Sequence, residues 1–316
     1  MTAGAIAEGK HSIFLVFEYM EHDLLGLISR KIKFGLPQFK FIALQLLLGL
    51  KSLHDEGIIH RDIKCNIFHN LAANILANKH GEVKVGDFGL GRQMCDKAKP
   101  LTIKVMTMIY RAPEVLLGMV NYTTKVDMWG LGCVLVEVLI GEPLFCTAKT
   151  PQHLIDQIFT RMGTPTEESW PGVTALQYYQ ELNPKKPPYD GNITNYIFKK
   201  NPKADRASVD FAVWMLTLNP DKRPSTDEAL NHIFFVNSPI ACTKDEMPKV
   251  EKECHELEIR KLIMQKRERE KQAMLNQANQ MQARKTQPGM SMMPGIGHQG
   301  QHTGNPFFAN HNQFRR

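Results

Sequence analysis

Hydrophobic positions along the chain follow two spacings, one typical of strands and the other of helices. Residues 12–19 are mostly aromatic and β-branched, which predicts a buried strand. Over residues 37–56 apolar side chains recur at helical spacing, which predicts a helix of several turns that ends at Gly57. Residues 131–140 are apolar on all sides apart from Glu137, so we expect a fully buried helix that is too short to span a membrane.

Short motifs whose side chains could take part in catalysis follow two short apolar runs. In chain order the motifs are His60-Arg61-Asp62, Asp87-Phe88-Gly89 and Ala112-Pro113-Glu114. Each motif alone recurs by chance, but their order and the apolar runs at 58–59 and 83–85 make the set specific. Together they resemble the catalytic core of the eukaryotic protein kinases.

The resemblance implies an α+β protein-kinase-like fold for residues 1–240. Within it, residues 12–19 would be the strand that runs into the hinge, followed by a mainly α-helical C-terminal lobe. The sequence holds no G-x-G-x-x-G motif followed by a strand, no V-A-I-K lysine and no helical glutamate to pair with that lysine. We therefore expect the N-terminal lobe to be largely absent from this chain.

By this resemblance the first two motifs carry phosphoryl transfer from ATP with Mg²⁺. Asp62 would accept the proton of the attacking substrate hydroxyl, and Lys64 would place a positive charge beside the transferred phosphoryl group. Asp87 would hold Mg²⁺, because a hard cation prefers carboxylate oxygen.

The kinase pattern also requires an asparagine five residues after the catalytic aspartate, where this chain has Ile67. If residues 65–71 are an insertion, Asn74 takes that place and would hold the second metal ion. A second interpretation gives the role to Asn66. A third treats residues 65–71 as a splicing or gene-model error, and the sequence leaves all three open.

The hinge resemblance assigns nucleotide contacts to three residues. The backbone groups of Glu18 and Met20 would bind adenine, and Asp23 would reach a ribose hydroxyl. An ordinary core strand explains the apolar residues of this segment equally well, so the assignment depends on the later motifs.

Thr107 matches the activating phosphothreonine position of the cyclin-dependent kinases. A phosphate there would carry nearly two negative charges and would be clamped by guanidinium groups. Arg61 and Arg92 fit that clamp by motif position, although a solvated loop arginine explains Arg92 as well.

Three further residues match structural positions of the family. Asp127, near the start of the buried helix, would anchor the backbone of the catalytic loop. Glu114 would form a buried ion pair with Arg223, a pairing that is usually structural.

Other segments narrow the resemblance to the cyclin-dependent kinases. They are Gly-Thr-Pro at 163–165, Trp-Pro-Gly-Val at 170–173, the hinge run 17–24 and residues 229–235. The set is most similar to the transcription-elongation kinases, first the cyclin T-partnered subunit of P-TEFb, with cyclin K-partnered relatives still open. This implies a nuclear serine/threonine kinase acting on Ser-Pro or Thr-Pro sites, notably of the RNA polymerase II C-terminal repeat domain. The alternative is a catalytically inactive truncated kinase or pseudokinase that acts as a binding module.

Composition limits the other functions. The net charge of +7 is moderate and spread over solvated faces, so we expect no direct nucleic-acid or membrane partner. The N-terminus lacks a basic and apolar leader, and the six cysteines show no paired spacing, which fits reduced intracellular thiols. Residues 241–285 are charged and predict a helical extension, and residues 286–316 predict a disordered tail.

Overall fold

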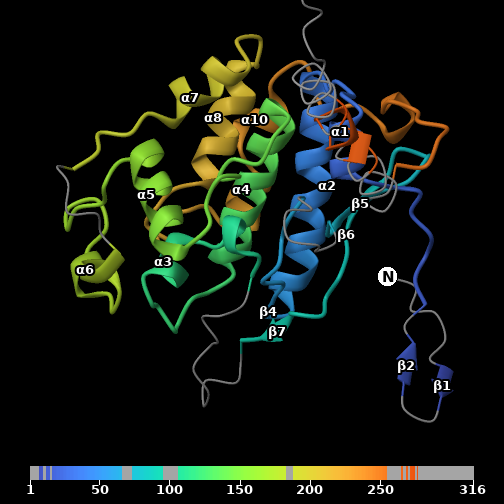
Figure 1. The fold of residues 1–316 in the computed structure, drawn as a ribbon. Coiled ribbons are helices and arrows are strands. Elements are labelled where there is room, and N and C mark those ends of the chain that lie inside the picture. Colours follow the sequence, from blue (N-terminus) through green and yellow to red (C-terminus); the bar gives the residue numbers. More distant parts are fainter. Residues whose placement is uncertain are drawn as a thin grey trace, which may run out of the picture. The chain divides into compact units, whose positions relative to one another are not determined.

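The computed structural model describes residues 16–65, 73–94, 106–182 and 188–254, together with two short strands before them and helical residues at 265, 268–269, 271–274 and 276. The chain divides into two units, residues 1–263 and 264–316. Every element named below lies in the first unit (Figure 1). The predicted tail, residues 286–316, lies outside the described residues.

The strands of the first unit form three small antiparallel sheets. β1 (Ala7–Gly9) pairs with β2 (Ser12–Phe14), β4 (Ile58–Ile59) pairs with β7 (Arg92–Gln93), and β5 (Ile75–Ala77) lies between β3 (His22–Asp23) and β6 (Val83–Val85).

Helices are the main regular structure of the described chain. They are α1 (Leu24–Ser29), α2 (Leu36–Asp55), α3 (Pro113–Leu116), α4 (Lys125–Ile140), α5 (Pro151–Met162), α6 (Tyr179–Leu182), α7 (Ile193–Lys200), α8 (Arg206–Met215), α9 (Thr226–Leu230) and α10 (Ile233–Val236), with short 3₁₀ turns η1 (Met108–Tyr110), η2 (Val173–Ala175) and η3 (Lys244–Glu246). Among the described residues, no helix is both long enough and apolar enough to cross a membrane.

The two long helices predicted from the apolar spacing are confirmed. α2 covers residues 36–55, and one face of it, including Leu46 and Leu50, is fully buried, whereas Leu48 is 45% exposed. α4 contains the apolar run, and every residue from Val126 to Glu137 is buried. α4 packs closely against α8, because Gly132 leaves room where a Cβ atom would lie 2.8 Å from the Leu216 side chain.

The strand predicted over residues 12–19 is wrong in its second half. β2 covers only the first part, and residues 16–20 belong to no strand of the described chain. The side chains of Val16, Phe17 and Tyr19 are 58%, 64% and 65% exposed, whereas Met20 is buried. The apolar, β-branched composition of this run favours burial, but no described segment covers these three side chains.

The segment after α10 packs against other parts of the first unit. The Cys242 N–H donates to the Pro37 carbonyl at 3.1 Å, and the Cys254 carbonyl accepts from the Asp23 N–H at 3.1 Å. A Cβ atom on Gly81 would lie 2.1 Å from the Lys244 carbonyl oxygen, which shows how closely this segment lies on the turn between β5 and β6. Residues 241–254 contain one 3₁₀ turn, η3, and no α-helix. The structural division at residue 263 therefore differs from the boundary at 240 that composition predicts.

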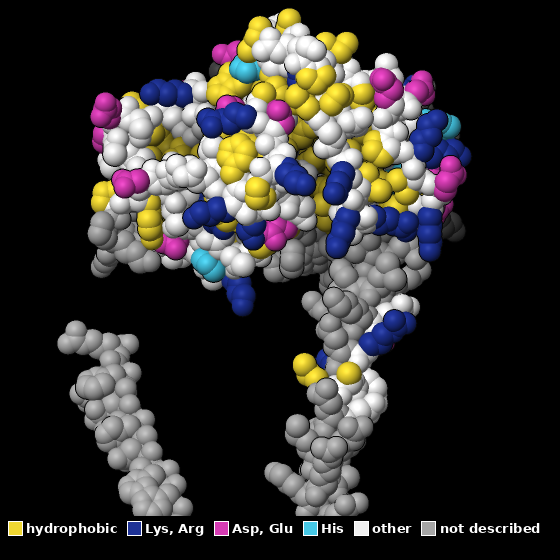
Figure 2. All heavy atoms as spheres, turned by 90° about the horizontal axis from the view of Figure 1, so that it is seen from above, with side chains coloured by type: hydrophobic (Ala, Val, Ile, Leu, Met, Phe, Trp, Pro, Cys, Tyr) yellow, Lys and Arg dark blue, Asp and Glu magenta, His cyan; other side chains and the backbone are white. Residues whose placement is uncertain are grey.

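Figure 2 shows one face of the molecule, on which Lys and Arg side chains are scattered among acidic and hydrophobic ones.

Candidate active site

The Asp62 carboxylate lies just after β4 and is held by neighbours from separate parts of the chain. Lys64 Nζ lies 2.6 Å from Asp62 Oδ2, and both side chains are almost fully buried. Oδ1 accepts hydrogen bonds from the N–H of Thr107 at 3.1 Å and from its hydroxyl at 3.0 Å. The carboxylate therefore has a fixed orientation and a positive charge beside it.

Asn74 lies directly against this carboxylate. Its Nδ2 donates to the Asp62 backbone carbonyl at 2.8 Å and to Oδ2 at 3.0 Å. Its N–H donates to the Lys64 carbonyl at 3.1 Å, so the two ends of the segment that contains the extra residues are joined. Its Oδ1 is buried and has no hydrogen-bond partner among the described atoms. Asn66, the rival candidate, and the rest of the stretch 66–72 lie outside the described residues.

Backbone pairing carries Asn74 to the second motif. In the β5–β6 pair Ile75 lies opposite Val85, and the Gly86 N–H donates to the Asn74 carbonyl at 2.8 Å. Asp87, the next residue, is exposed and has a positive φ of 59°, which is unusual for a residue other than glycine. Its Oδ1 accepts from the Gly89 N–H at 3.2 Å.

His60 joins the two motifs by its ring. Nδ1 accepts from the Asp62 N–H at 3.2 Å, so the ring proton lies on Nε2, which faces the Gly86 carbonyl at 3.0 Å. The Phe88 ring packs edge-on against His60, with ring centroids 5.5 Å apart. The catalytic-loop motif and the Asp-Phe-Gly motif therefore form one connected site.

The Asp127 carboxylate holds the backbone of the catalytic loop by hydrogen bonds. Its two carboxylate oxygens accept from the N–H groups of His60 and Arg61 at 2.9 Å and 2.8 Å, the contact that the sequence predicts for this residue. His54 Nε2 lies 2.9 Å from the same carboxylate. Arg61 has a φ of 66°, and the two carboxylate hydrogen bonds hold the backbone in that unfavourable conformation.

The structure argues against Thr107 as a phosphate acceptor. Its side chain is only 7% exposed, and its hydroxyl donates to Asp62 rather than facing solvent. The sequence motif locates the correct stretch, but it does not reveal that this hydroxyl points inward at the carboxylate. The geometry suits a residue that orients Asp62.

The two arginines predicted to clamp a phosphate have other contacts. Arg61 donates through Nε to the Leu90 carbonyl at 2.7 Å and through Nη1 to the Tyr122 hydroxyl at 3.5 Å. The backbone of Arg92 pairs with Ile59 in the small β4–β7 sheet. Residues 95–105, where any phosphate on the preceding loop would lie, are outside the described residues.

Glu114 and Arg223 form the predicted buried ion pair. Two hydrogen bonds of 2.8 Å and 2.9 Å join the guanidinium to the carboxylate, and both side chains are essentially inaccessible. Arg223 also donates to the carbonyls of Thr217, Lys125 and Leu218 and lies 5.2 Å from the Trp129 ring centroid. The pair thus ties α3 to α4 and to the loop before α9.

The three residues predicted to contact nucleotide, Glu18, Met20 and Asp23, lie in different surroundings. Glu18 is exposed, with its carboxylate 2.6 Å from Lys84 Nζ, whereas Met20 is buried. Asp23 caps α1, because its Oδ1 accepts from the Gly26 N–H at 2.6 Å. The nucleotide contacts of these residues stay predictions.

Sequence reasoning missed one buried polar contact close to the site. The Tyr110 hydroxyl in η1 donates to Glu137 Oε2 in α4 at 2.6 Å. Burial raises the pKa of Glu137 to about 8, and the hydrogen bond from Tyr110 opposes this only in part. Glu137 is the single acidic residue in an otherwise apolar run, and this feature of the sequence could have pointed to the contact.

Comparisons with known proteins agree with this geometry. The model of the protein kinase domain matches residues 2–235. Cyclin-dependent kinase G-2 of Oryza sativa subsp. indica is 42% identical over 241 residues, which are 75% of this chain and 33% of that protein. Cyclin-dependent kinase C-1 of Oryza sativa subsp. japonica is 38% identical over 266 residues, 84% of this chain and 49% of that protein.

Two solved structures are similar as well. The crystal structure of the yeast RNA Pol II CTD kinase CTDK-1 complex contains a chain that is 35% identical, with a TM-score of 0.68 and 77% of each chain covered. The CAK complex from Chaetomium thermophilum bound to ATP-γ-S gives 32% identity and a TM-score of 0.69, covering 78% of this chain and 75% of that one.

The chain belongs to the protein kinase family. Within that family the relatives named above are cyclin-dependent kinases, and the similarity to them covers three quarters or more of this chain. The chain spans about a third of the length of kinase G-2 and about half of kinase C-1.

Proposed function

We propose that this chain is the catalytic part of a cyclin-dependent serine/threonine kinase that transfers the γ-phosphate of ATP to Ser-Pro or Thr-Pro sites. The observation that carries the proposal is the buried arrangement of Lys64, Asn74 and Thr107 around the Asp62 carboxylate. Phosphoryl transfer needs mainly positioning and charge stabilisation, and this arrangement supplies both.

In the proposed mechanism Asp62 accepts the proton of the substrate hydroxyl. Thr107 and Asn74 hold the carboxylate by hydrogen bonds, so its lone pairs are aimed before substrate arrives. Lys64, 2.6 Å from the carboxylate, places its charge where negative charge develops on the transferred group.

The residues present fit Mg²⁺. Asn74 Oδ1 is a buried oxygen without a hydrogen-bond partner, and Asp87 offers an exposed carboxylate on the adjoining strand end. Oxygen ligands of these two types suit Mg²⁺, which when bound neutralises phosphate charge. Among the described residues no group of three or more His, Cys, Asp or Glu could hold a metal ion, so substrate phosphate and water would complete the coordination.

The conformation of Met106 supports the proposed preference for proline after the phosphorylated residue. This residue has a φ of 70°, and its carbonyl accepts from Arg111 Nη2 at 3.2 Å. Met106 precedes Thr107, which touches Asp62, so a substrate whose hydroxyl lies on Asp62 passes close to it. Because this carbonyl is turned to Arg111, it does not serve a substrate N–H at that position, and proline has no N–H to leave unsatisfied.

We propose a cyclin of the T or K type as partner and the nucleus as location. The support is the naming of the relatives as cyclin-dependent kinases and the solved complex of an RNA Pol II CTD kinase. The C-terminal repeat domain of RNA polymerase II is accordingly the proposed substrate. We further propose that residues 1–240 hold the hinge and C-terminal lobe, with Glu18, Met20 and Asp23 on the nucleotide side.

A second candidate function is a binding module without turnover. The exposed side chains of Val16, Phe17 and Tyr19 favour it, because an adenine pocket would cover this face and no described segment does so.

The two functions are separated by peptide phosphorylation with the full-length protein and its cyclin. We expect a Ser-Pro peptide to be phosphorylated at least about tenfold faster than the matched Ser-Ala peptide, a difference of about 1.4 kcal/mol in barrier. A Ser-(N-methyl-Ala) peptide, which also lacks the N–H, should recover part of the rate. Equal rates for Ser-Pro and Ser-Ala would contradict the specificity, and no transfer to either peptide would favour the binding module.

A further inference from the structure

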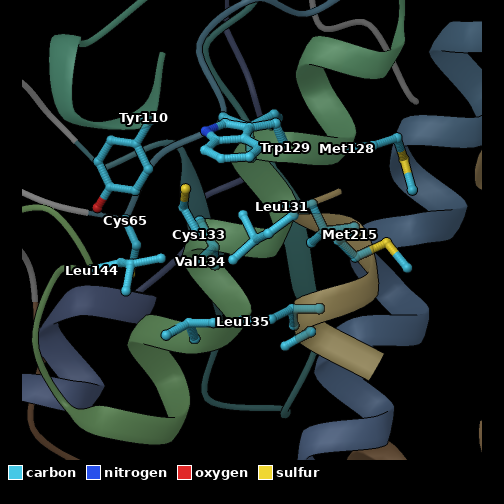
Figure 3. Packing of buried hydrophobic residues seen from close by; sticks show 14 of the residues in the cluster. Cys65, Tyr110, Met128, Trp129, Leu131, Cys133, Val134, Leu135, Leu144 and Met215 are labelled. Atoms are coloured by element: carbon cyan, nitrogen blue, oxygen red, sulfur yellow. The ribbon is translucent and has the colours of Figure 1, made fainter. Parts of the chain in front are cut away.

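The first residue after Lys64 is buried in the core, although sequence assigns it to the insertion. Cys65 is fully inaccessible, and burial raises the pKa of its thiol well above the usual value. Figure 3 shows it beside the Tyr110 hydroxyl, below Trp129 and near Leu144. The inserted stretch, residues 65–71, therefore begins at a buried residue, and we call this buried start its root.

The Tyr110 hydroxyl is the polar contact at that root. It lies beside Cys65 and donates to Glu137 Oε2 at 2.6 Å. All three groups are buried, so this hydrogen bond is not exchanged for water. The chain of contacts runs from the catalytic loop through η1 to α4.

The cluster carries no ionic charge near neutral pH. Burial raises the pKa of Glu137 to about 8 and raises the pKa of Tyr110 well above 10. The other titratable groups that bear on Glu137 are the thiols of Cys65 and Cys133, and burial raises the pKa of both. The cluster is therefore a neutral hydrogen-bonded anchor within an apolar core.

We propose that Tyr110 and Glu137 are positioning residues, which fix the root of the inserted stretch at Cys65 and thereby hold Lys64 and Asn74 beside Asp62. The Lys64 carbonyl receives the Asn74 N–H at 3.1 Å, so fixing Cys65 also fixes the point where the chain returns to the site. Asp62 is bound by Thr107 three residues before Tyr110, so one short segment braces both the carboxylate and the insertion. The inference deepens the proposed kinase function, since it assigns a support to that site.

Thiol labelling of the native full chain tests the anchor without any need for turnover. N-ethylmaleimide labelling is followed at Cys65 by peptide mass spectrometry, with Cys133 as the internal control because it is equally buried on α4. We expect Tyr110→Phe and Glu137→Met to raise the labelling rate of Cys65 at least about tenfold, because each leaves a buried polar group unpaired. Glu137→Gln keeps an oxygen acceptor for Tyr110 and should leave the rate within about twofold of the wild type. The two Glu137 variants carry the test alone if Tyr110→Phe does not fold.

Two results would overturn the anchor: an unchanged Cys65 rate in Glu137→Met, or an equal rise at Cys65 and Cys133, which would mean general loosening. In the cyclin-bound full-length protein, Glu137→Met should lower kcat with the KM for ATP and peptide unchanged, and Glu137→Gln should restore it. A Cys65 rate that rises as expected in a protein without any kinase activity would leave the anchor standing and refute the proposed function instead.

Discussion

At the scale of residues, the Asp62 side chain is held by one residue that is near in sequence and by two that are further along the chain. Lys64 lies two residues after Asp62, whereas Asn74 and Thr107 lie 12 and 45 residues after it. The first contact follows from the motif alone. The inward hydroxyl of Thr107 does not, because motif spacing identifies a residue and not the direction of its side chain.

The buried carboxyl of Glu137 makes stability depend on pH. Its pKa is about 8 in the folded chain against 4.5 as the ordinary value, so between these values the proton is lost only on unfolding. The stabilisation is complete below about pH 4.5 and falls as pH rises towards 8, by about 1.4 kcal/mol per unit at most.

The Glu137→Gln variant has no ionisable group at this position, so its stability should lack this dependence on pH. All other groups titrate alike in both proteins. We expect the unfolding free energy of the wild type to fall relative to the variant by roughly 3 kcal/mol between pH 5.5 and pH 8, as measured by urea denaturation. Parallel stability curves over that range would show that Glu137 is ionised in the folded protein.

At the scale of elements, α4 is the frame of the site. Asp127 near its start holds the catalytic loop, Trp129 lies under Arg223, and Glu137 in its last turns holds Tyr110. Polar side chains inside a helix that is buried on all sides need partners, and each of these contacts joins α4 to another segment.

The Glu114–Arg223 pair gives a stability prediction for this frame. Arg223→Met would leave the Glu114 carboxylate buried without its partner, and we expect a loss of about 3–5 kcal/mol in the unfolding free energy. Arg206→Met is the matched control, because Arg206 pairs with Asp210 on the exposed face of α8. That change should be below about 1 kcal/mol in the same urea titration. Losses of equal size in the two variants would contradict the structural role of the buried pair.

Much of this frame could be predicted from the sequence. Apolar spacing gave α2 and α4, and motif position gave the Asp127 contact and the Glu114–Arg223 pair. The exposed hinge side chains and the Tyr110–Glu137 contact could not be predicted, because both depend on what the rest of the chain brings to the same place.

At the scale of the molecule, the chain after α10 matters for the nucleotide side of the proposed site. Two of its residues contact the predicted hinge: Glu253 accepts from the Tyr19 hydroxyl at 3.1 Å, and the Cys254 N–H donates to the Glu21 carbonyl at 3.3 Å. Composition marked the region beyond residue 240 as a separate charged extension, because charge patterning does not register backbone pairing. Residues 241–254 belong to the first unit of the chain.

The central claim is that Asp62, Asn74 and Asp87 form one kinase site despite the residues inserted between Lys64 and Asn74. The direct test measures phosphorylation of a Ser-Pro peptide against Mg²⁺ concentration in the cyclin-bound full-length protein, for the wild type, Asp62→Asn, Asn74→Ala and Asn66→Ala. We expect Asp62→Asn to abolish transfer. Asn74→Ala should lower the rate at least about tenfold and raise the Mg²⁺ concentration needed for half-maximal rate, whereas Asn66→Ala should stay within about twofold of the wild type. If Asn66→Ala loses activity while Asn74→Ala keeps it, or if the wild type transfers no more phosphate than Asp62→Asn, the account of the site is wrong.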